Sequence, residues 1–119
     1  MAIGQLLHAT HATTPTPFYT PWTGRGGNAA VFAADVIAAN YGSGKVKITI
    51  QTKNSGQADA SATDLASFSD INTIPIPATP PTKYASSMLE LVRFKIEVFG
   101  DPSDNWVHMR MLAPSWVTN

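Results

Sequence analysis

The chain has 119 residues, enough for one domain with a single core, and its eight basic residues balance eight acidic ones. This neutral charge gives no long-range attraction to nucleic acid or to an anionic membrane, so we expect neither partner. The sequence has no cysteine, no apolar run of transmembrane length and no signal-peptide pattern, so it predicts no disulfide, zinc–thiolate site, membrane span or secretory leader.

Residues 1–27 are predicted to form an extended, proline-rich N-terminal arm that precedes a folded domain at 28–119. Prolines among threonines oppose both a helix and a central strand in this segment. The arm also contains three aromatic residues that need to be covered: Phe18, Tyr19 and Trp22. The sequence leaves open whether the arm lies as a strap across its own core or on a neighbouring subunit.

Residues 29–40 fit two patterns. Their alanines favour a helix, whereas the alternation of Ala30, Phe32, Ala34 and Val36 with the intervening residues favours a strand. We predict a strand, because a short Gly-Ser-Gly turn joins the segment to a clear strand at 45–53. The preceding GRGG sequence lacks the lysine of a phosphate-binding loop and is interpreted as a turn.

The strand at 45–53 alternates strictly. Val46, Ile48 and Ile50 are predicted to point inward, and the lysines on the opposite face are interpreted as solubilising charges along a sheet edge. A short half-buried strand is predicted at 65–71, followed by a connection rich in proline at 72–83.

Two further strands are predicted near the C-terminus, at 88–99 and 106–112, joined by a turn at 100–105. In the first, the even-numbered residues from Met88 to Val98 are predicted to face inward, whereas Arg93, Lys95 and Glu97 face solvent. The complete pattern predicts an all-β fold, an antiparallel, jelly-roll-like β-sandwich with the extended N-terminal arm.

The sequence contains no recognisable catalytic or metal-binding motif. His8 and His11 fall on opposite faces of an extended chain, and no nucleophile elbow is present. Asp59, Asp64 and Asp70 are interpreted as solvating charges, with a loose calcium site as the alternative. We therefore predict no enzyme activity, no catalytic residues, no cofactor and no metal.

The aromatic residues near the two ends of the chain are the candidate interface residues. Both tails are expected to dock, either on their own domain or on a neighbour, because tryptophan and tyrosine are enriched at interfaces. The candidates are Phe18, Tyr19, Trp22, Trp106 and Trp116.

Three stretches carry a resemblance to a known group of proteins. They are FYTPWTGRGGN leading into AAVFAADVI, KVKITIQTKN followed by DLASFSDI, and LELVRFKIEVFGDPSDNWVHMRMLAPSWV. Together they resemble the small β-sandwich structural proteins of tailed-phage and prophage head modules, which often act as capsid decoration (cement) proteins.

This resemblance implies a protein that binds the outer surface of the phage head and stabilises the contacts between capsomers. Its partner is then the major capsid protein, its oligomeric state is a homotrimer, and its location is the virion surface after assembly in the host cytoplasm. Phe18, Tyr19 and Trp22 are expected to make the contact, with Trp116 as a second anchor. A chain without residues 1–23 is then expected to fold but to attach more weakly.

Two other functions remain open at this point. A phage tail or baseplate component would have the same type of sequence. A non-catalytic carbohydrate-binding β-sandwich would place a coplanar row of aromatic side chains on one face.

Overall fold

The computed structural model describes residues 7–10, 17–40, 45–69, 80–99 and 106–117, and for 7–10, 38–40 and 106 it describes the backbone alone. The strands within these ranges are β1 (Leu7–Thr10), β2 (Phe18–Tyr19), β3 (Thr23–Gly24), β4 (Ala29–Asn40), β5 (Lys45–Lys53), β6 (Thr63–Ser67), β7 (Thr82–Ser86), β8 (Leu91–Phe99), β9 (Trp106–Met111) and β10 (Ser115–Val117). One described 3-10 helix, η1 (Asp59–Ser61), lies between β5 and β6. None of the described residues forms a helix long and apolar enough to span a membrane.

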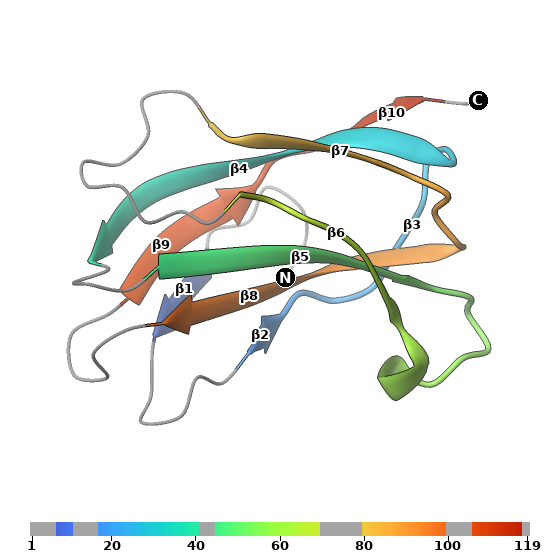
Figure 1. Cartoon of the computed structure of the whole chain (residues 1–119), viewed down its shortest axis with the longest axis horizontal. Coiled ribbons are helices and arrows are strands. Elements are labelled where there is room, and N and C mark those ends of the chain that lie inside the picture. The colour runs from blue at the N-terminus through green and yellow to red at the C-terminus, as the bar shows by residue number, and fades with distance from the viewer. Residues whose placement is uncertain (1–6, 11–16, 41–44, 70–79, 100–105, 118–119) are drawn as a thin grey trace.

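The strands form two antiparallel sheets that lie face to face (Figure 1). The first, called here the β4 sheet, contains β1, β9, β4, β10 and β7. Leu112 N donates to Ala33 O on one side of β4, and Ala34 N donates to Pro81 O on the other. Strand β10 therefore continues β9 along one side of β4, while β7 occupies the opposite side.

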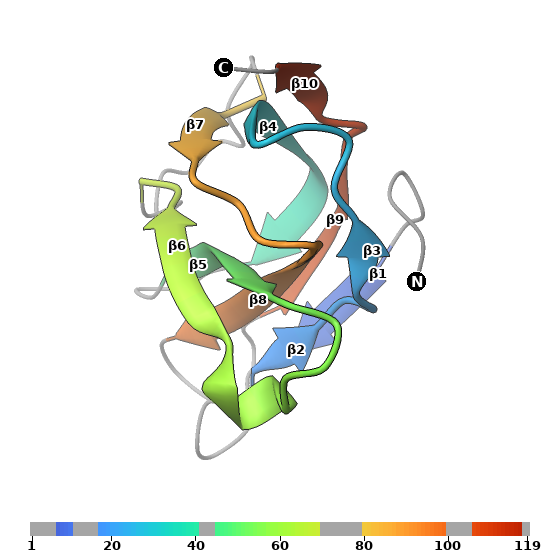
Figure 2. The same cartoon turned by 90° about the vertical axis from the view of Figure 1, so that its right-hand side faces the viewer.

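The second sheet, called here the β5 sheet, has the order β2-β8-β5-β6, with β3 also paired to β8. Strands β5 and β8 pair along their full lengths, from Lys45 opposite Phe99 to Lys53 opposite Leu91. The chain passes between the two sheets repeatedly, so that β4 and β5, which are consecutive, lie in different layers (Figure 2).

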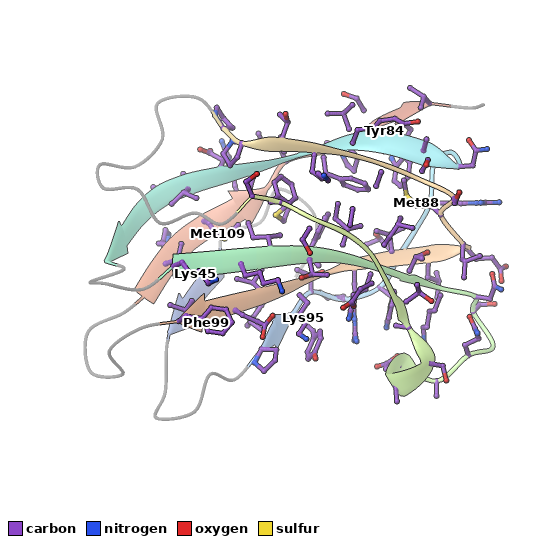
Figure 3. All side chains as sticks on the ribbon, in the orientation of Figure 1. Lys45, Tyr84, Met88, Lys95, Phe99 and Met109 are labelled. Carbon is purple, nitrogen blue, oxygen red and sulfur yellow. The ribbon has the colours of Figure 1, made fainter. Side chains whose placement is uncertain are left out.

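The core fills the space between the sheets with the inward side chains of β4, β5, β8 and β9. Phe32 of β4 lies at its centre, with its ring edge-on to Phe94 of β8 at 5.5 Å between centroids and to Trp116 of β10 at 5.9 Å. Met88 and Met109 are fully enclosed in the same interior (Figure 3). Edge-on aromatic pairs add to the stabilisation from burying apolar area, so Phe32 holds the two layers together.

The predicted strands at 29–40 and 45–53 are confirmed by β4 and β5. The strand predicted from residue 88 instead begins at Leu91, after a turn in which Ser87 has a positive φ of 62°. Glu90, which was predicted to point inward, is exposed, and its carboxylate accepts a hydrogen bond from Ser55 N at 3.1 Å. A residue in the turn before a strand does not follow the alternation of that strand.

The short strand predicted at 65–71 is β6, which runs from Thr63 to Ser67 and is followed by the buried Phe68. The predicted turns at 42–44 and 100–105, most of the proline-rich connection at 72–83, and His11 and Asp70 lie outside the described residues. Where the structure describes the predicted arm, it pairs with its own chain: β1 with β9, and β2 and β3 with β8.

Candidate binding site

Polar and aromatic side chains gather on the outer face of the β5 sheet. Gln51 of β5 and Arg93 of β8 lie directly opposite each other there, and Tyr19 of β2 is on the next strand. The loop that carries η1 folds back beside this sheet, which brings Asp59 to the same face (Figure 2). Residues from four separate segments therefore meet at one place.

Arg93 is at the centre of this group. Its guanidinium carbon lies 4.1 Å from the centre of the Tyr19 ring and 4.5 Å from that of Trp22, so the cation contacts two aromatic rings. Its Nε donates to Gln51 Oε1 at 2.8 Å. Arg93 was predicted to face solvent, and this was wrong: it points outward but is only 8% exposed, because the N-terminal segment covers it.

Thr20 fixes the segment that covers Arg93. The backbone N of Thr20 donates to Phe94 O at 3.0 Å, and its hydroxyl accepts a hydrogen bond from Phe94 N at 2.9 Å. Thr20 is buried, so both bonds are shielded from water. Phe18 then points into the core and Tyr19 points outward, as the alternation of an extended chain requires.

Asp59 closes one side of the group. Its Oδ1 accepts hydrogen bonds from Lys53 Nζ at 2.8 Å and from Trp22 Nε1 at 2.9 Å, and its Oδ2 lies 3.6 Å from Arg93 Nη1. The hydrogen bond from Lys53, followed by that from Trp22 and the charges of Lys53 and Arg93, lowers the pKa of Asp59 below its ordinary value of 3.8. The carboxylate is therefore ionised at neutral pH, and its side chain is 61% exposed.

Lys53 was interpreted as a solubilising charge, and the structure corrects this. The residue is buried; its Nζ donates to Gln57 O at 2.8 Å and lies 4.9 Å from the centre of the Trp22 ring. Its ammonium group thus supports Asp59 and Trp22 rather than a free sheet edge. Asp64, also interpreted as a solvating charge, accepts a hydrogen bond from Gln51 Nε2 at 2.8 Å.

An open depression of about 380 Å³ lies over this group. The residues that line it are Tyr19, Gln51, Asp59, Ala60, Ala62 and Arg93. These six side chains offer a ligand hydrogen-bonding groups, both signs of charge and an aromatic surface. Within the described part of the chain, no group of three or more histidine or acidic residues could hold a metal ion.

Of the four predicted interface residues whose side chains the structure describes, two come together, Tyr19 and Trp22, which both contact Arg93. Phe18 packs against the core from β2, and Trp116 packs against Phe32 in the other sheet. Trp106 opens β9, where its backbone pairs with Thr10 and Asn40, and its side chain is outside the described residues. Docking of these residues on a neighbour remains a prediction; the contacts described here are with their own chain.

Sequence reasoning missed the central residues of the site. Alternation correctly places Gln51, Lys53 and Arg93 on outer strand faces, but it does not identify what covers those faces. A pairing prediction that set Gln51 opposite Arg93, with tyrosine on the adjacent strand, would have been the signal.

The outer face of the β4 sheet has a different character. Val31 of β4 is 39% exposed and lies opposite Tyr84 of β7, which is 52% exposed. Ile37 and Val117 are also exposed large apolar residues of this sheet. We call Val31, Ile37, Tyr84 and Val117 the apolar face; Tyr84 lies on the side of the molecule opposite Lys45, Lys95 and Phe99 (Figure 3).

Comparison with known proteins gives no information on function. No family model, curated protein or solved structure matches this chain. The features that bear on function are therefore the connectivity of the two sheets, the apolar face of the β4 sheet and the depression over Arg93.

Proposed function

We propose that this chain is a viral structural protein, a jelly-roll decoration protein that binds the outer surface of a phage head and stabilises the contacts between capsomers. The observation that carries the proposal is the order of the strands. Its partner is the major capsid protein, and its contribution is adhesive area rather than chemistry. The chain is accordingly not an enzyme in this proposal.

The jelly-roll assignment follows from treating collinear strands as one. Strands β2 and β3 both pair with the same side of β8, and β9 and β10 follow each other along one side of β4. If β2 with β3, and β9 with β10, each count as one strand, the described part of the chain has eight strands, which we number 1 to 8 in chain order. Their order is then 1-8-3-6 in the β4 sheet (β1, β9/β10, β4, β7) and 2-7-4-5 in the β5 sheet (β2/β3, β8, β5, β6). Eight antiparallel strands in two sheets with such long-range pairing are typical of jelly rolls, which serve as viral capsid and lectin domains.

The apolar face is the surface that we assign to the capsid. Exposed valine, isoleucine and tyrosine on one sheet face are unfavourable in water and favourable against a partner. Many copies acting together need only a modest interface each, roughly 800 Å² per partner. We propose a homotrimer on the virion surface, assembled in the host cytoplasm, as the working form.

A tail or baseplate component is the other assignment that the same fold supports. It differs in location and partner, not in the type of surface. An assay with isolated heads separates the two, because a tail component has no binding sites on the head.

The test uses heads assembled without this chain. Purified chain is added, the heads are sedimented, and the bound chain is measured together with the temperature at which the heads release DNA. We expect saturable binding and a higher release temperature. Failure of the unmodified chain to bind heads contradicts the proposal.

Variants locate the contact. Replacing Val31 and Tyr84 together by serine should weaken binding by about tenfold or more, because tyrosine is enriched among the few interface residues that carry most of the binding energy. Tyr19→Ser is the matched control, since it makes the same change to an exposed tyrosine on the opposite face. Loss of binding in the control alone would move the contact to the N-terminal segment, as the sequence analysis expected.

A further inference from the structure

We propose that the depression over Arg93 binds an uncharged saccharide, with neighbouring hydroxyl groups bridging Arg93 and Asp59 and the sugar ring against the exposed edge of the Tyr19 ring. This activity is separate from attachment to a capsid, because it uses the β5 sheet rather than the apolar face of the β4 sheet. It relies on one aromatic ring, that of Tyr19, and does not require a coplanar row of aromatic residues.

The hydrogen-bonding groups of the depression define the ligand. The Nη groups of Arg93 only donate, and among the described residues they have no hydrogen-bond acceptor; Asp59 Oδ2 is in ion-pair range at 3.6 Å. Asp59 Oδ2 only accepts, and both described hydrogen bonds to this carboxylate end on Oδ1. A ligand that satisfies both residues must accept at one atom and donate at the next. Two adjacent hydroxyl groups of a sugar do this, because each hydroxyl both donates and accepts.

The charges of the depression favour a neutral ligand. An anion drawn to Arg93 would lie beside the ionised carboxylate of Asp59, and a cation drawn to Asp59 would lie beside Arg93. Because its pKa is lowered, Asp59 is negatively charged at neutral pH, and the two opposite charges lie side by side. Hydroxyl groups gain charge-assisted hydrogen bonds from both residues without bringing a charge of their own.

Tyr19 supplies the apolar surface. One face of its ring stacks on the guanidinium of Arg93, and the residue is still 42% exposed. An exposed aromatic ring next to polar groups is a common arrangement in small-molecule sites, where the ring covers the apolar part of the ligand. Ala60 and Ala62 on the rim have short side chains, which leave room for a six-membered ring.

The site is already in place without a ligand. Arg93 is held by Tyr19, Trp22 and the hydrogen bond to Gln51, and Gln51 is held in turn by Asp64. Asp59 is held by Lys53 and Trp22. Binding therefore requires little ordering of protein side chains, which favours measurable affinity from few contacts.

The test is calorimetric titration of the full chain with neutral hexasaccharides of glucose, galactose, mannose and N-acetylglucosamine, followed by a wider array of immobilised neutral glycans. We expect at least one to bind. Tyr19→Ala and Asp59→Asn should each weaken that binding by about tenfold, because each removes one of the main contacts. Tyr84→Ser, on the opposite face, should leave it unchanged.

A second variant guards against misfolding. Ala60→Phe fills the depression from an exposed position and removes no described contact, so the variant should fold normally and lose saccharide binding. Binding that survives Ala60→Phe, or no binding to any neutral glycan, would overturn the inference. Binding of acidic glycans alone, or loss of head binding in Tyr19→Ala without saccharide binding, would overturn it as well. The saccharide titrations do not test head binding through Val31 and Tyr84, and loss of head binding in Tyr19→Ala would relocate the capsid contact, so the two proposals fail separately.

Discussion

The guanidinium carbon of Arg93 lies 4.1 Å from the centre of the Tyr19 ring, and this contact joins the N-terminal segment to the β5 sheet. Arg93→Lys keeps the positive charge but loses the planar group that stacks on two rings and the Nε bond to Gln51. We expect the free energy of unfolding in urea to fall by about 1–2 kcal/mol.

Lys95 provides the control for this prediction. It is two residues along the same strand, and its ion pair with Glu97 spans 3.9 Å at a partly exposed position. Lys95→Gln should change the free energy of unfolding by less than about 0.5 kcal/mol. Equal effects of the two substitutions would show that Arg93 acts only as a surface charge.

The hydroxyl of Thr20 should contribute measurably to stability. Thr20→Ala leaves the buried Phe94 N without its acceptor, and we expect a loss of about 1–3 kcal/mol in the free energy of unfolding. Thr20→Ser retains the hydroxyl and should recover most of this loss. If serine and alanine destabilise equally, the methyl group rather than the hydrogen bond is what matters.

The same contacts change the expectation for a chain without residues 1–23. This deletion removes β1 and β2, the two hydrogen bonds of Thr20, the core contact of Phe18 and the two rings that contact Arg93. We expect this chain to unfold at a lower urea concentration than the intact protein, rather than to lose attachment alone. An unchanged unfolding midpoint would contradict this expectation and show that residues 1–23 are not needed for stability.

Gly27 allows the C-terminal strand to lie close to the start of β4. A Cβ atom at this position would meet the backbone carbonyl of Val117 in β10, which cannot rotate away. Gly27→Ala should destabilise the chain by about 1–3 kcal/mol and speed amide hydrogen exchange in β10. Gly24→Ala is the matched control, because a Cβ there meets nothing within 4 Å. Normal protection of β10 in Gly27→Ala would contradict the prediction.

Asp59 should make stability depend on pH in the acidic range. Its pKa is lower in the folded chain, so its stabilising effect is fully present above the unfolded value and is lost as the pH falls through the folded value. The difference in unfolding free energy between the unmodified chain and Asp59→Asn should be constant at neutral pH and shrink below 3.8. Urea unfolding at a series of pH values measures this difference in free energy. A difference that grows on acidification would contradict the prediction.

Alternation in the sequence was sufficient for the strands that form the core. Ile48 and Phe94 lie inside because each is one of a series of apolar residues at every second position, and a buried sheet face requires that pattern. For residues 29–40 alternation and alanine content disagreed, and the neighbouring turn and strand decided the prediction; in the structure β4 pairs on both sides, which overrides the helical propensity of its alanines.

The site could not be predicted in the same way. Whether Arg93 faces water depends on Tyr19 and Trp22, which are more than seventy residues away in the sequence and follow no repeat that links them to β8. Trp116 is a second example: the sequence left open whether this tryptophan docks on its own domain or on a neighbour, and the short strand β10 on β4 brings it to Phe32. Long-range pairing between sheets decided both outcomes.

The most direct test of the decoration role is a cryo-electron microscopy reconstruction of particles of the virus or prophage that we propose as the source of this chain. We predict density for the two-layer fold on the outside of the head, at the junctions between capsomers, with the β4 sheet and its Val31 and Tyr84 turned toward the capsid. Density for the fold in the tail or baseplate, or particles that contain no copy of the chain, would contradict the account.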